Sequence, residues 1–305
     1  KKEIKGKELR RAYSISSSTD KDGITIGIKK VDNGGFSNYA NSQLKVGDTL
    51  EVMEPEGRFV FKRTKEVQNI AAFAAGSGIT PIMSIVKSVL DSNPKNTFVL
   101  VYGNKSYEET MFYTDLVKLE LEYANRFFVY FTNSQTREDK ALFGRIDTST
   151  VNYALLNKHK DVDFDGYYLC GPEEMIRLVQ DTLIENEVDK DKIHFELFTP
   201  TEIKEELPIQ ADGQTAVTVI VDDEEFQFTM DKKTIILDAV LKENIDAPYS
   251  CQGGVCSSCI AKVTEGSAEM VMNQILTDKE IADGFILTCQ AHATTPTIKV
   301  DFDDV

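Results

Sequence analysis

The pattern of hydrophobic and polar positions divides the chain into three stretches. Residues 1–66 alternate in the manner of β-strands, with turn residues between the segments. Residues 67–199 contain short apolar runs separated by stretches of helical periodicity. Residues 214–305 begin and end in strand-like segments, and residues 200–213 before them are rich in Thr, Pro and Glu, as a linker would be. The pattern predicts three domains, the last of them joined through this linker.

Each stretch predicts a different architecture. The first predicts strands at 8–15, 25–31 and 49–53, which would form part of a β-barrel. The last predicts a strand hairpin and one crossing helix over 234–243, which is typical of a β-grasp fold. The middle stretch alternates strands with helices, which indicates an α/β domain with a parallel sheet covered on both faces. Its predicted strands are 70–75, 97–102, 127–131, 166–169 and 193–198, and its helices include 107–123 and 173–186.

Charge is unevenly distributed along the chain. The net charge is −16, and residues 201–305 hold 20 Asp and Glu against 7 Lys and Arg, whereas the first 200 residues hold 30 against 27. Nucleic-acid binding is disfavoured, because a polyanion would be repelled. The acidic last stretch serves either general solubility or docking of a basic protein partner. No apolar run is long enough to cross a bilayer.

A glycine turn follows the first strand of the middle stretch. The residues Gly76-Ser77-Gly78-Ile79-Thr80-Pro81 precede a helical period, in which we expect Thr80 as N-cap and Pro81 at the first helical position. A strand, a glycine turn and a helix N-terminus together can bind a dinucleotide pyrophosphate. Cys170-Gly171-Pro172 follows another strand, and parallel sheets bind ligands at such strand ends.

Four of the five cysteines lie in the last stretch. The first three have the spacing C-x4-C-x2-C and the fourth follows alone, which is the plant-type pattern for a [2Fe–2S] cluster. We expect Gly253 and Gly254 to adopt the left-handed torsions that wrapping a cluster requires. Zinc is disfavoured because its cysteines usually pair on both sides of the site, and disulfides because reducing compartments keep thiols free. The predicted ligands are Cys251, Cys256, Cys259 and Cys289.

Two resemblances follow from these motifs. The string PYSCQGGVCSSC, with Cys289 in Leu-Thr-Cys-Gln, resembles plant-type ferredoxins. The ordered set Arg11-Ala12-Tyr13-Ser14, the turn at 76–81, Cys170-Gly171-Pro172 and Glu196-Leu197-Phe198 resembles ferredoxin–NADP reductase-like flavoproteins. The barrel of that family normally has about two more strands before the first motif, so we expect residues to be missing at the N-terminus.

The reductase resemblance implies roles for individual residues. FAD would be held by Arg11, Tyr13, Ser14, Gly35, Phe36, Ser37 and Phe198, with the glycine-containing segment on its phosphates. NADPH or NADH would be held by Gly76, Gly78, Thr80, Cys170, Gly171 and Pro172. Ser14, Thr80 and Cys170 would lie at the site of hydride transfer. Taken alone, the segment Gly34–Asn38 could equally be a hairpin turn.

The domain order resembles the reductase components of multicomponent oxygenases, among them those of phenylacetyl-CoA epoxidase systems. The resemblance implies a cytoplasmic enzyme that passes electrons from NAD(P)H through FAD and the [2Fe–2S] cluster to an oxygenase partner, with no membrane involved. A Rieske oxygenase, a ferredoxin-like protein or a quinone are alternative acceptors. An electron carrier whose reductase half is only a scaffold is the alternative from another class. The choice of nucleotide stays open; Lys105 and Arg137 are candidate partners of a 2′-phosphate.

Overall fold

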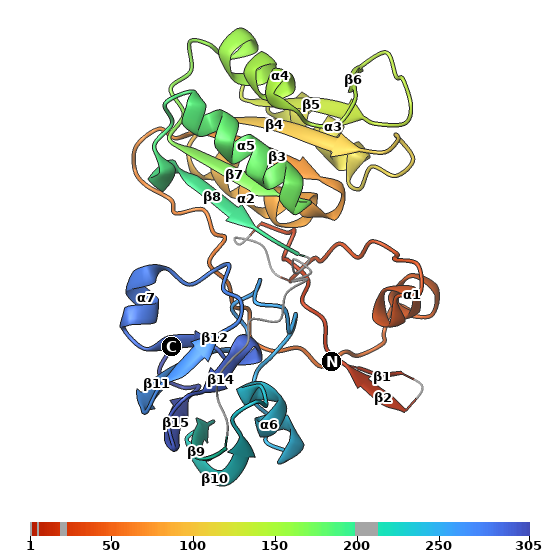
Figure 1. Cartoon of the computed structure of the whole chain (residues 1–305). Helices are drawn as coiled ribbons and strands as arrows, with labels where there is room; N and C mark the ends of the chain where they lie inside the picture. Colours follow the sequence, from red (N-terminus) through yellow and green to blue (C-terminus); the bar gives the residue numbers. More distant parts are fainter. Residues whose placement is uncertain (1, 5, 19–22, 199–212) are drawn as a thin grey trace.

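The computed structural model describes residues 2–4, 6–18, 23–198 and 213–305 (Figure 1). The predicted linker, 200–213, lies outside the described residues except for its last position. The domain bounds therefore stay a prediction.

The N-terminal segment contains little regular structure. Strands β1 (Lys2–Ile4) and β2 (Lys7–Leu9) form an antiparallel hairpin. An isolated bridge joins Ile15 to Ile26, and helix α1 (Gly35–Ser42) follows. This segment lies beside the two larger parts of the molecule (Figure 1).

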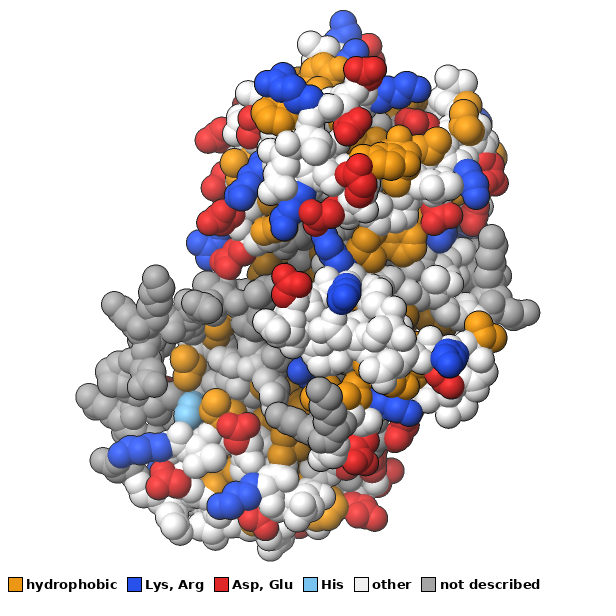
Figure 2. Space-filling model, turned by 90° about the vertical axis from the view of Figure 1, so that its right-hand side faces the viewer, with side chains coloured by type: hydrophobic (Ala, Val, Ile, Leu, Met, Phe, Trp, Pro, Cys, Tyr) orange, Lys and Arg blue, Asp and Glu red, His pale blue; other side chains and the backbone are white. Residues whose placement is uncertain are grey.

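The strands predicted at 8–15, 25–31 and 49–53 are wrong as regular strands. In the described part of the chain, they form only the end of β2 and the isolated bridge. A strand persists where a neighbouring strand bonds its backbone groups, and local alternation alone does not supply that neighbour. Several apolar side chains of the segment are consequently exposed, among them Val46 and Val52, and Figure 2 shows hydrophobic side chains on this side of the molecule.

The middle part is built on a parallel sheet, as predicted, but the sheet has six strands, because the short edge strand β6 joins the five that were predicted. The strand order is β6-β5-β4-β3-β7-β8. In chain order the strands are β3 (Asn69–Ala75), β4 (Thr97–Asn104), β5 (Phe127–Asn133), β6 (Ala141–Phe143), β7 (Gly166–Cys170) and β8 (Ile193–Glu196). The chain moves from β3 to one side and later returns to its other side, so the carboxyl ends of β3 and β7 border a switch point, where such sheets bind ligands.

Helices cover both faces of this sheet (Figure 1). They are η1 (Gly76–Gly78), α2 (Ile79–Ser92), α3 (Tyr113–Glu122), α4 (Thr148–Asn152), the π-helix η2 (Tyr153–Lys158), α5 (Glu173–Glu185) and η3 (Lys190–Lys192). The apolar faces of α2 and α3 enclose one core, and those of α4 and α5 enclose a second core on the opposite face. The helix predicted at 107–123 begins only at Tyr113, because Phe112 has a left-handed φ of 57° that a helix cannot include.

The last part has the predicted β-grasp arrangement. Its sheet has the order β10-β9-β15-β11-β13, in which β15 runs parallel to β9 and the other pairs are antiparallel. The elements are β9 (Gln214–Val221), β10 (Glu224–Asp231), α6 (Ile236–Lys242), β11 (Ile260–Glu265), β12 (Ala268–Met270), α7 (Asp278–Ala282), β13 (Phe285–Leu287), η4 (Thr288–Gln290), β14 (Ala291–Ala293) and β15 (Thr297–Asp301). None of the helices in the described residues is long and apolar enough to cross a membrane.

Candidate functional site

The four predicted ligand cysteines converge from two segments. Cys251, Cys256 and Cys259 lie on the loop between α6 and β11, which we call the cysteine loop (residues 250–259), and Cys289 lies in η4. Thr288 ties the segments together, because its backbone N–H and its hydroxyl both donate to the carbonyl of Cys259, at 3.0 and 2.9 Å. Cys259 and Cys289 are only 1% and 3% exposed, whereas the other two thiols are half-buried.

The backbone of the cysteine loop curls around its sulfur atoms. Gln252 and Gly254 have left-handed φ values of 53° and 72°. The prediction was therefore right for Gly254 but wrong for Gly253, which is not among the left-handed residues. Gly253 instead donates its N–H to the Cys251 sulfur at 3.3 Å. Such N–H···S bonds help to set the potential of a cluster.

The four thiols lie close enough to form one hydrogen-bond network. The pKa of Cys251 is lowered by its hydrogen bonds with Cys256 and then Cys289, and that of Cys259 by its bond with Cys289. The same bonds raise the pKa of Cys256 and Cys289, so all four sulfurs share one network. Among the described residues, no three or more His, Cys, Asp or Glu side chains surround a single-ion position. A [2Fe–2S] core does not require one, because it divides its four thiolates between two irons.

A hollow of about 330 Å³ joins the cysteine loop to the Arg-x-Tyr-Ser motif. Its lining residues are Arg11, Ala12, Phe198, Ser250, Cys251 and Gln252. The structure therefore brings Arg11 and Phe198, both predicted to hold FAD, to the predicted cluster ligand Cys251. A flavin bound here would lie next to the cluster.

The other predicted flavin residues lie at the start of α1. The segment predicted as a glycine turn is the first turn of this helix, with Gly34 as its N-cap and no side-chain cap. Phe36 and Ser37 are buried, and the Phe36 ring lies 5.6 Å from that of Tyr13. The first backbone N–H groups of a helix lack partners within it and attract phosphate. The N-terminus of α1 thus fits the predicted phosphate contact beside Tyr13.

Ser14 and Cys170 meet at a residue that the predicted site did not include. The Ser14 hydroxyl donates to a Glu196 carboxylate oxygen at 3.3 Å, and Glu196 is the strand partner of Cys170 across β7 and β8. Burial raises the pKa of Glu196 to about 7 and, together with the charge of Glu196, raises the pKa of the Cys170 thiol well above its usual range. In the sequence, a carboxylate at the end of an apolar strand was the signal for this residue.

The proton of Glu196 gives a pH dependence to stability. Its pKa is about 7 in the folded protein against an ordinary value of 4.5, so the folded state binds this proton more tightly than the unfolded state. The stabilising contribution is complete below pH 4.5 and is lost as the pH rises through about 7. The unfolding free energy of the unmodified protein should fall between pH 6 and pH 8 because of this group. In Glu196→Gln that fall should be smaller by about 1 kcal/mol. Urea denaturation of both proteins at the two pH values measures this; equal losses would contradict it.

The glycine turn packs directly on the Cys170 strand end. A Cβ on Gly78 would lie 2.1 Å from the carbonyl oxygen of Cys170, so only glycine fits there. Thr80 is not the N-cap as predicted, because η1 continues into α2 and the N-cap position is Gly78. Thr80 is buried, and its hydroxyl donates to the carbonyl of Ser77 at 2.9 Å, which braces the turn. Pro81 is accordingly the third helical residue rather than the first.

A lysine outside the predicted site lies beside this turn. The Lys29 ammonium is 4.0 Å from the position that a Cβ on Gly76 would take. It pairs with Glu109 at 3.6 Å and is about one-third exposed. A cation beside a glycine turn and a helix N-terminus adds to the attraction for a pyrophosphate. Its signal in the sequence is weak, because Lys29 is one of many lysines and lies far along the chain from Gly76.

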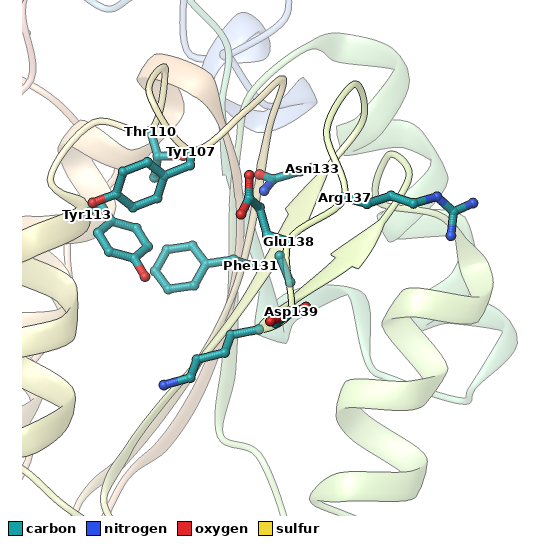
Figure 3. Close-up of a pocket in the computed structure, with 10 residues that line it drawn as sticks. Tyr107, Thr110, Tyr113, Phe131, Asn133, Arg137, Glu138 and Asp139 are labelled. Atoms are coloured by element: carbon teal, nitrogen blue, oxygen red, sulfur yellow. The ribbon is translucent and has the colours of Figure 1, made fainter.

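A pocket of about 440 Å³ lies beyond the carboxyl end of β5 (Figure 3). The rings of Tyr107, Tyr113 and Phe131 line one side, with centroid distances of 4.4 and 4.9 Å between successive rings. Figure 3 shows the Arg137 side chain pointing away from these rings, and its guanidinium lies 4.3 Å from the ring of Phe143. Lys105 is not among the lining residues.

Two buried hydroxyls on and after β5 have no hydrogen-bond partner among the described residues. They are the hydroxyls of Thr132 and Thr136. Thr132 is 1% exposed and is the next-to-last residue of β5, at the carboxyl end of this strand. Neither threonine lines the pocket, so these two hydroxyls are buried polar groups of the surrounding fold and not part of the pocket wall.

Comparison with protein families assigns all three parts. Residues 1–61 match an oxidoreductase FAD-binding domain, 73–181 an oxidoreductase NAD-binding domain, and 219–294 a 2Fe-2S iron-sulfur cluster binding domain. These matches confirm FAD, a pyridine nucleotide and a [2Fe–2S] cluster as the cofactors.

Known proteins show the same combination along the whole chain. The chain is 38% identical to one component of 1,2-phenylacetyl-CoA epoxidase from Escherichia coli (strain K12), over 98% of this chain and 85% of that protein. It is 30% identical to the ferredoxin reductase component of 3-ketosteroid-9-alpha-monooxygenase from Rhodococcus rhodochrous, over 96% and 83% of the two chains. Phthalate dioxygenase reductase, a solved structure, matches 95% of this chain and 83% of its own, with a TM-score of 0.56 and 22% identity.

These likenesses agree with the predicted fold class. The shared fold consists of a flavin barrel, a parallel-sheet nucleotide domain and a ferredoxin domain. The chain belongs to the family of oxygenase reductase components that carry electrons from a pyridine nucleotide through FAD to a [2Fe–2S] cluster.

Proposed function

We propose that this reductase serves an oxygenase of the phenylacetyl-CoA epoxidase type. The single observation that carries the electron path is the hollow where Arg11 and Phe198 meet Cys251, because it lets a flavin and a cluster lie side by side. The choice of partner rests on the 38% identity to the component of that epoxidase from Escherichia coli. A Rieske oxygenase, a ferredoxin-like protein or a quinone is an outcome that the experiment below distinguishes.

Residues near the hollow hold the flavin. When bound, FAD supplies the exchange between hydride transfer, which moves two electrons, and the single-electron steps of an iron–sulfur cluster. Arg11 would hold its pyrophosphate through its guanidinium, which can bind an anion in a bidentate manner, and Tyr13 and Phe198 would cover its ring system. When FAD is bound, the Ser14 hydroxyl would donate to a ring nitrogen in place of Glu196. The N-terminus of α1, at Gly35, Phe36 and Ser37, binds phosphate.

The chain's residues at the hydride site orient the rings and exclude charge. The raised pKa of Cys170 keeps its thiol neutral, so no thiolate repels the hydride. Glu196, with a pKa of about 7, is partly protonated near neutral pH, and without flavin it holds Ser14 through the hydrogen bond at 3.3 Å. Thr80 braces Ser77, and thereby the turn that presents the nucleotide. No side chain in this set needs to act as a general acid or base.

Residues of the glycine turn hold the nucleotide's pyrophosphate. Gly76 leaves the backbone of the turn accessible, and Gly78 lets the turn pack on the strand end at Cys170, which Gly171 and Pro172 follow. The pocket beyond β5 receives the adenosine end of the nucleotide, with Tyr107 beside the base.

Lys29 should strengthen nucleotide binding. Lys29→Gln removes one cation beside the pyrophosphate, and we expect the KM for the nucleotide to rise about 5–10-fold with little change in kcat. Lys30→Gln is the matched control, because it removes the same charge from the neighbouring exposed residue. Steady-state kinetics with ferricyanide measure both; an equal rise in the two variants would contradict a specific contact.

Anaerobic addition of NADPH or NADH tests the electron path. The nucleotide that reduces the protein at the lower concentration is the donor. Both the flavin and the cluster absorbance should bleach. Mixing the reduced protein with purified di-iron epoxidase components should then reoxidise it and support turnover. Bleaching of the flavin alone would refute the electron path. Reoxidation by a quinone or a Rieske protein, but not by the di-iron protein, would refute the proposed partner.

A further inference from the structure

Two ion pairs join the ferredoxin domain to the N-terminal segment. The Arg10 guanidinium contacts the carboxylate of Asp246, and the Arg58 guanidinium lies 2.5 Å from a carboxylate oxygen of Glu280. Arg10 also lies over the ring of Tyr249, 5.0 Å from its centroid. In both pairs the reductase part supplies the cation and the ferredoxin domain supplies the anion.

Both carboxylates border the cysteine loop. Asp246 and Tyr249 lie five and two residues before Cys251. Glu280 lies on α7, and the segment before this helix contacts the loop, because Gln274 donates its N–H to the carbonyl of Gly254. The two ion pairs therefore hold the face of the ferredoxin domain that carries the cluster.

The reductase part already covers the face of the ferredoxin domain that carries the cysteine loop. Val255, near the tip of the cysteine loop, is 4% exposed because it packs into the apolar core formed by α4, α5 and the central sheet. Cys251 packs against the same core. Figure 1 shows the ferredoxin domain below that sheet.

Among the described residues, the partly exposed cluster thiols lie on the cysteine loop alone. Cys259 and Cys289 are buried in the core of the ferredoxin domain, and the partly exposed thiols are Cys251 and Cys256, both on the cysteine loop. An acceptor that takes electrons at close range has to approach this loop. It therefore competes with the reductase part for the same surface.

We propose that Asp246 and Glu280 form a docking surface that the ferredoxin domain uses alternately for its own reductase part and for the acceptor protein. The acceptor is a protein that presents Lys or Arg side chains around an apolar contact for Val255, in place of Arg10 and Arg58. This inference rests on the proposed electron path. Arg10 is mostly buried, but Asp246 is largely exposed and Arg58 and Glu280 are partly exposed. Salt screens ion pairs that reach solvent, so both pairs can open for the exchange.

Charge favours such a partner. The last third of the chain holds 20 acidic against 7 basic residues, whereas the first 200 residues are nearly balanced. Complementary charge accelerates the encounter of two proteins and orients them. At the docked surface, one electron passes from the reduced cluster to the ferric iron of the acceptor, and no bond or proton is exchanged.

The test measures the two uses of the surface separately. The first step is cluster reduction after rapid anaerobic mixing with the active nucleotide. The second is reduction of cytochrome c, a basic haem protein used as the probe acceptor, by protein reduced beforehand with stoichiometric dithionite at low ionic strength. Asp246→Asn with Glu280→Gln should slow both steps about fivefold or more. Arg10→Gln with Arg58→Gln should slow the first step similarly but accelerate the second about twofold, because the competing cations are gone.

Two controls separate these effects from damage to the fold. Glu224→Gln removes a charge from β10, the edge strand of the sheet, and should change neither step by more than about 1.5-fold. Exchanging the charges of one pair, Arg10→Asp with Asp246→Arg, should restore the first step but leave the second step slow. Glutamine at 280 can retain the capping box with Thr277.

Each result decides the question. If the carboxylate variants slow only the first step, the acceptor uses another face and the shared surface is refuted. If the arginine variants slow both steps equally, competition for the surface is refuted. If the unmodified protein shows no cluster reduction by either nucleotide, the electron path itself fails, and that failure is seen before any variant is compared.

Discussion

Replacing Cys289 with alanine should abolish electron delivery to cytochrome c, by more than about 100-fold, while reduction of the flavin by the nucleotide continues. Cys289 comes from η4, outside the cysteine loop, and is 3% exposed, so no other thiol can take its place. A [2Fe–2S] core needs four thiolates, and with three it should be lost or unstable. Iron and sulfide analysis, the cluster absorbance and the cytochrome c rate measure the effect. Ferricyanide reduction, which needs only the flavin, should persist.

The fifth cysteine provides the matched control. Cys170 is fully buried at the end of β7 and takes no part in the thiol network of the cysteine loop. Cys170→Ser should keep the iron content of the unmodified protein and slow flavin reduction by the nucleotide instead. The two variants thus have opposite profiles. A normal iron content in Cys289→Ala, or loss of iron in Cys170→Ser, would contradict the assignment of the ligands.

The parts of the fold that the sequence predicted are those with local causes. The parallel strands are continuous apolar runs because both faces of the sheet are covered, and this pattern is visible in β3 and β4 without knowledge of their neighbours. The start of α7 also has a local cause, because its capping box consists of two residues three positions apart, Thr277 and Glu280. The cluster ligands were recognisable because a short loop has to supply three thiolates at fixed spacing.

The features that the sequence could not predict depend on contacts between distant residues. The segments at 8–15 and 25–31 have strand-like alternation but form only the end of β2 and an isolated bridge, because pairing depends on a neighbouring strand. Lys29 reaches Gly76, and Glu196 reaches Ser14, only because the N-terminal segment lies against the carboxyl edge of the sheet. The start of α2 was misplaced because a 3₁₀ turn continues into the helix, which no capping residue in the sequence signals.

The glycines of the turn at 76–78 are needed for different physical reasons. Gly76 has a left-handed φ of 55°, but a Cβ there would meet only the Lys29 ammonium, at 4.0 Å. Gly78 has an ordinary φ of −59°, which any residue adopts, but a Cβ there would lie 2.1 Å from one backbone oxygen and 2.4 Å from the adjoining carbon of Cys170. Torsion limits the first position and space limits the second.

Gly78→Ala should therefore be the more damaging substitution. Backbone atoms cannot rotate away as a side chain does, so the turn and the end of β7 have to separate; we expect a loss of about 3 kcal/mol or more in stability. That movement also displaces the nucleotide from the hydride site, and a shift of about 1 Å can slow flavin reduction about 100-fold. Gly76→Ala should lose only about 1–2 kcal/mol, the cost of left-handed torsion for a residue with a Cβ. Thermal denaturation and rapid-mixing flavin reduction measure both variants, and a larger loss in Gly76→Ala would show that torsion, not contact with Cys170, determines the turn.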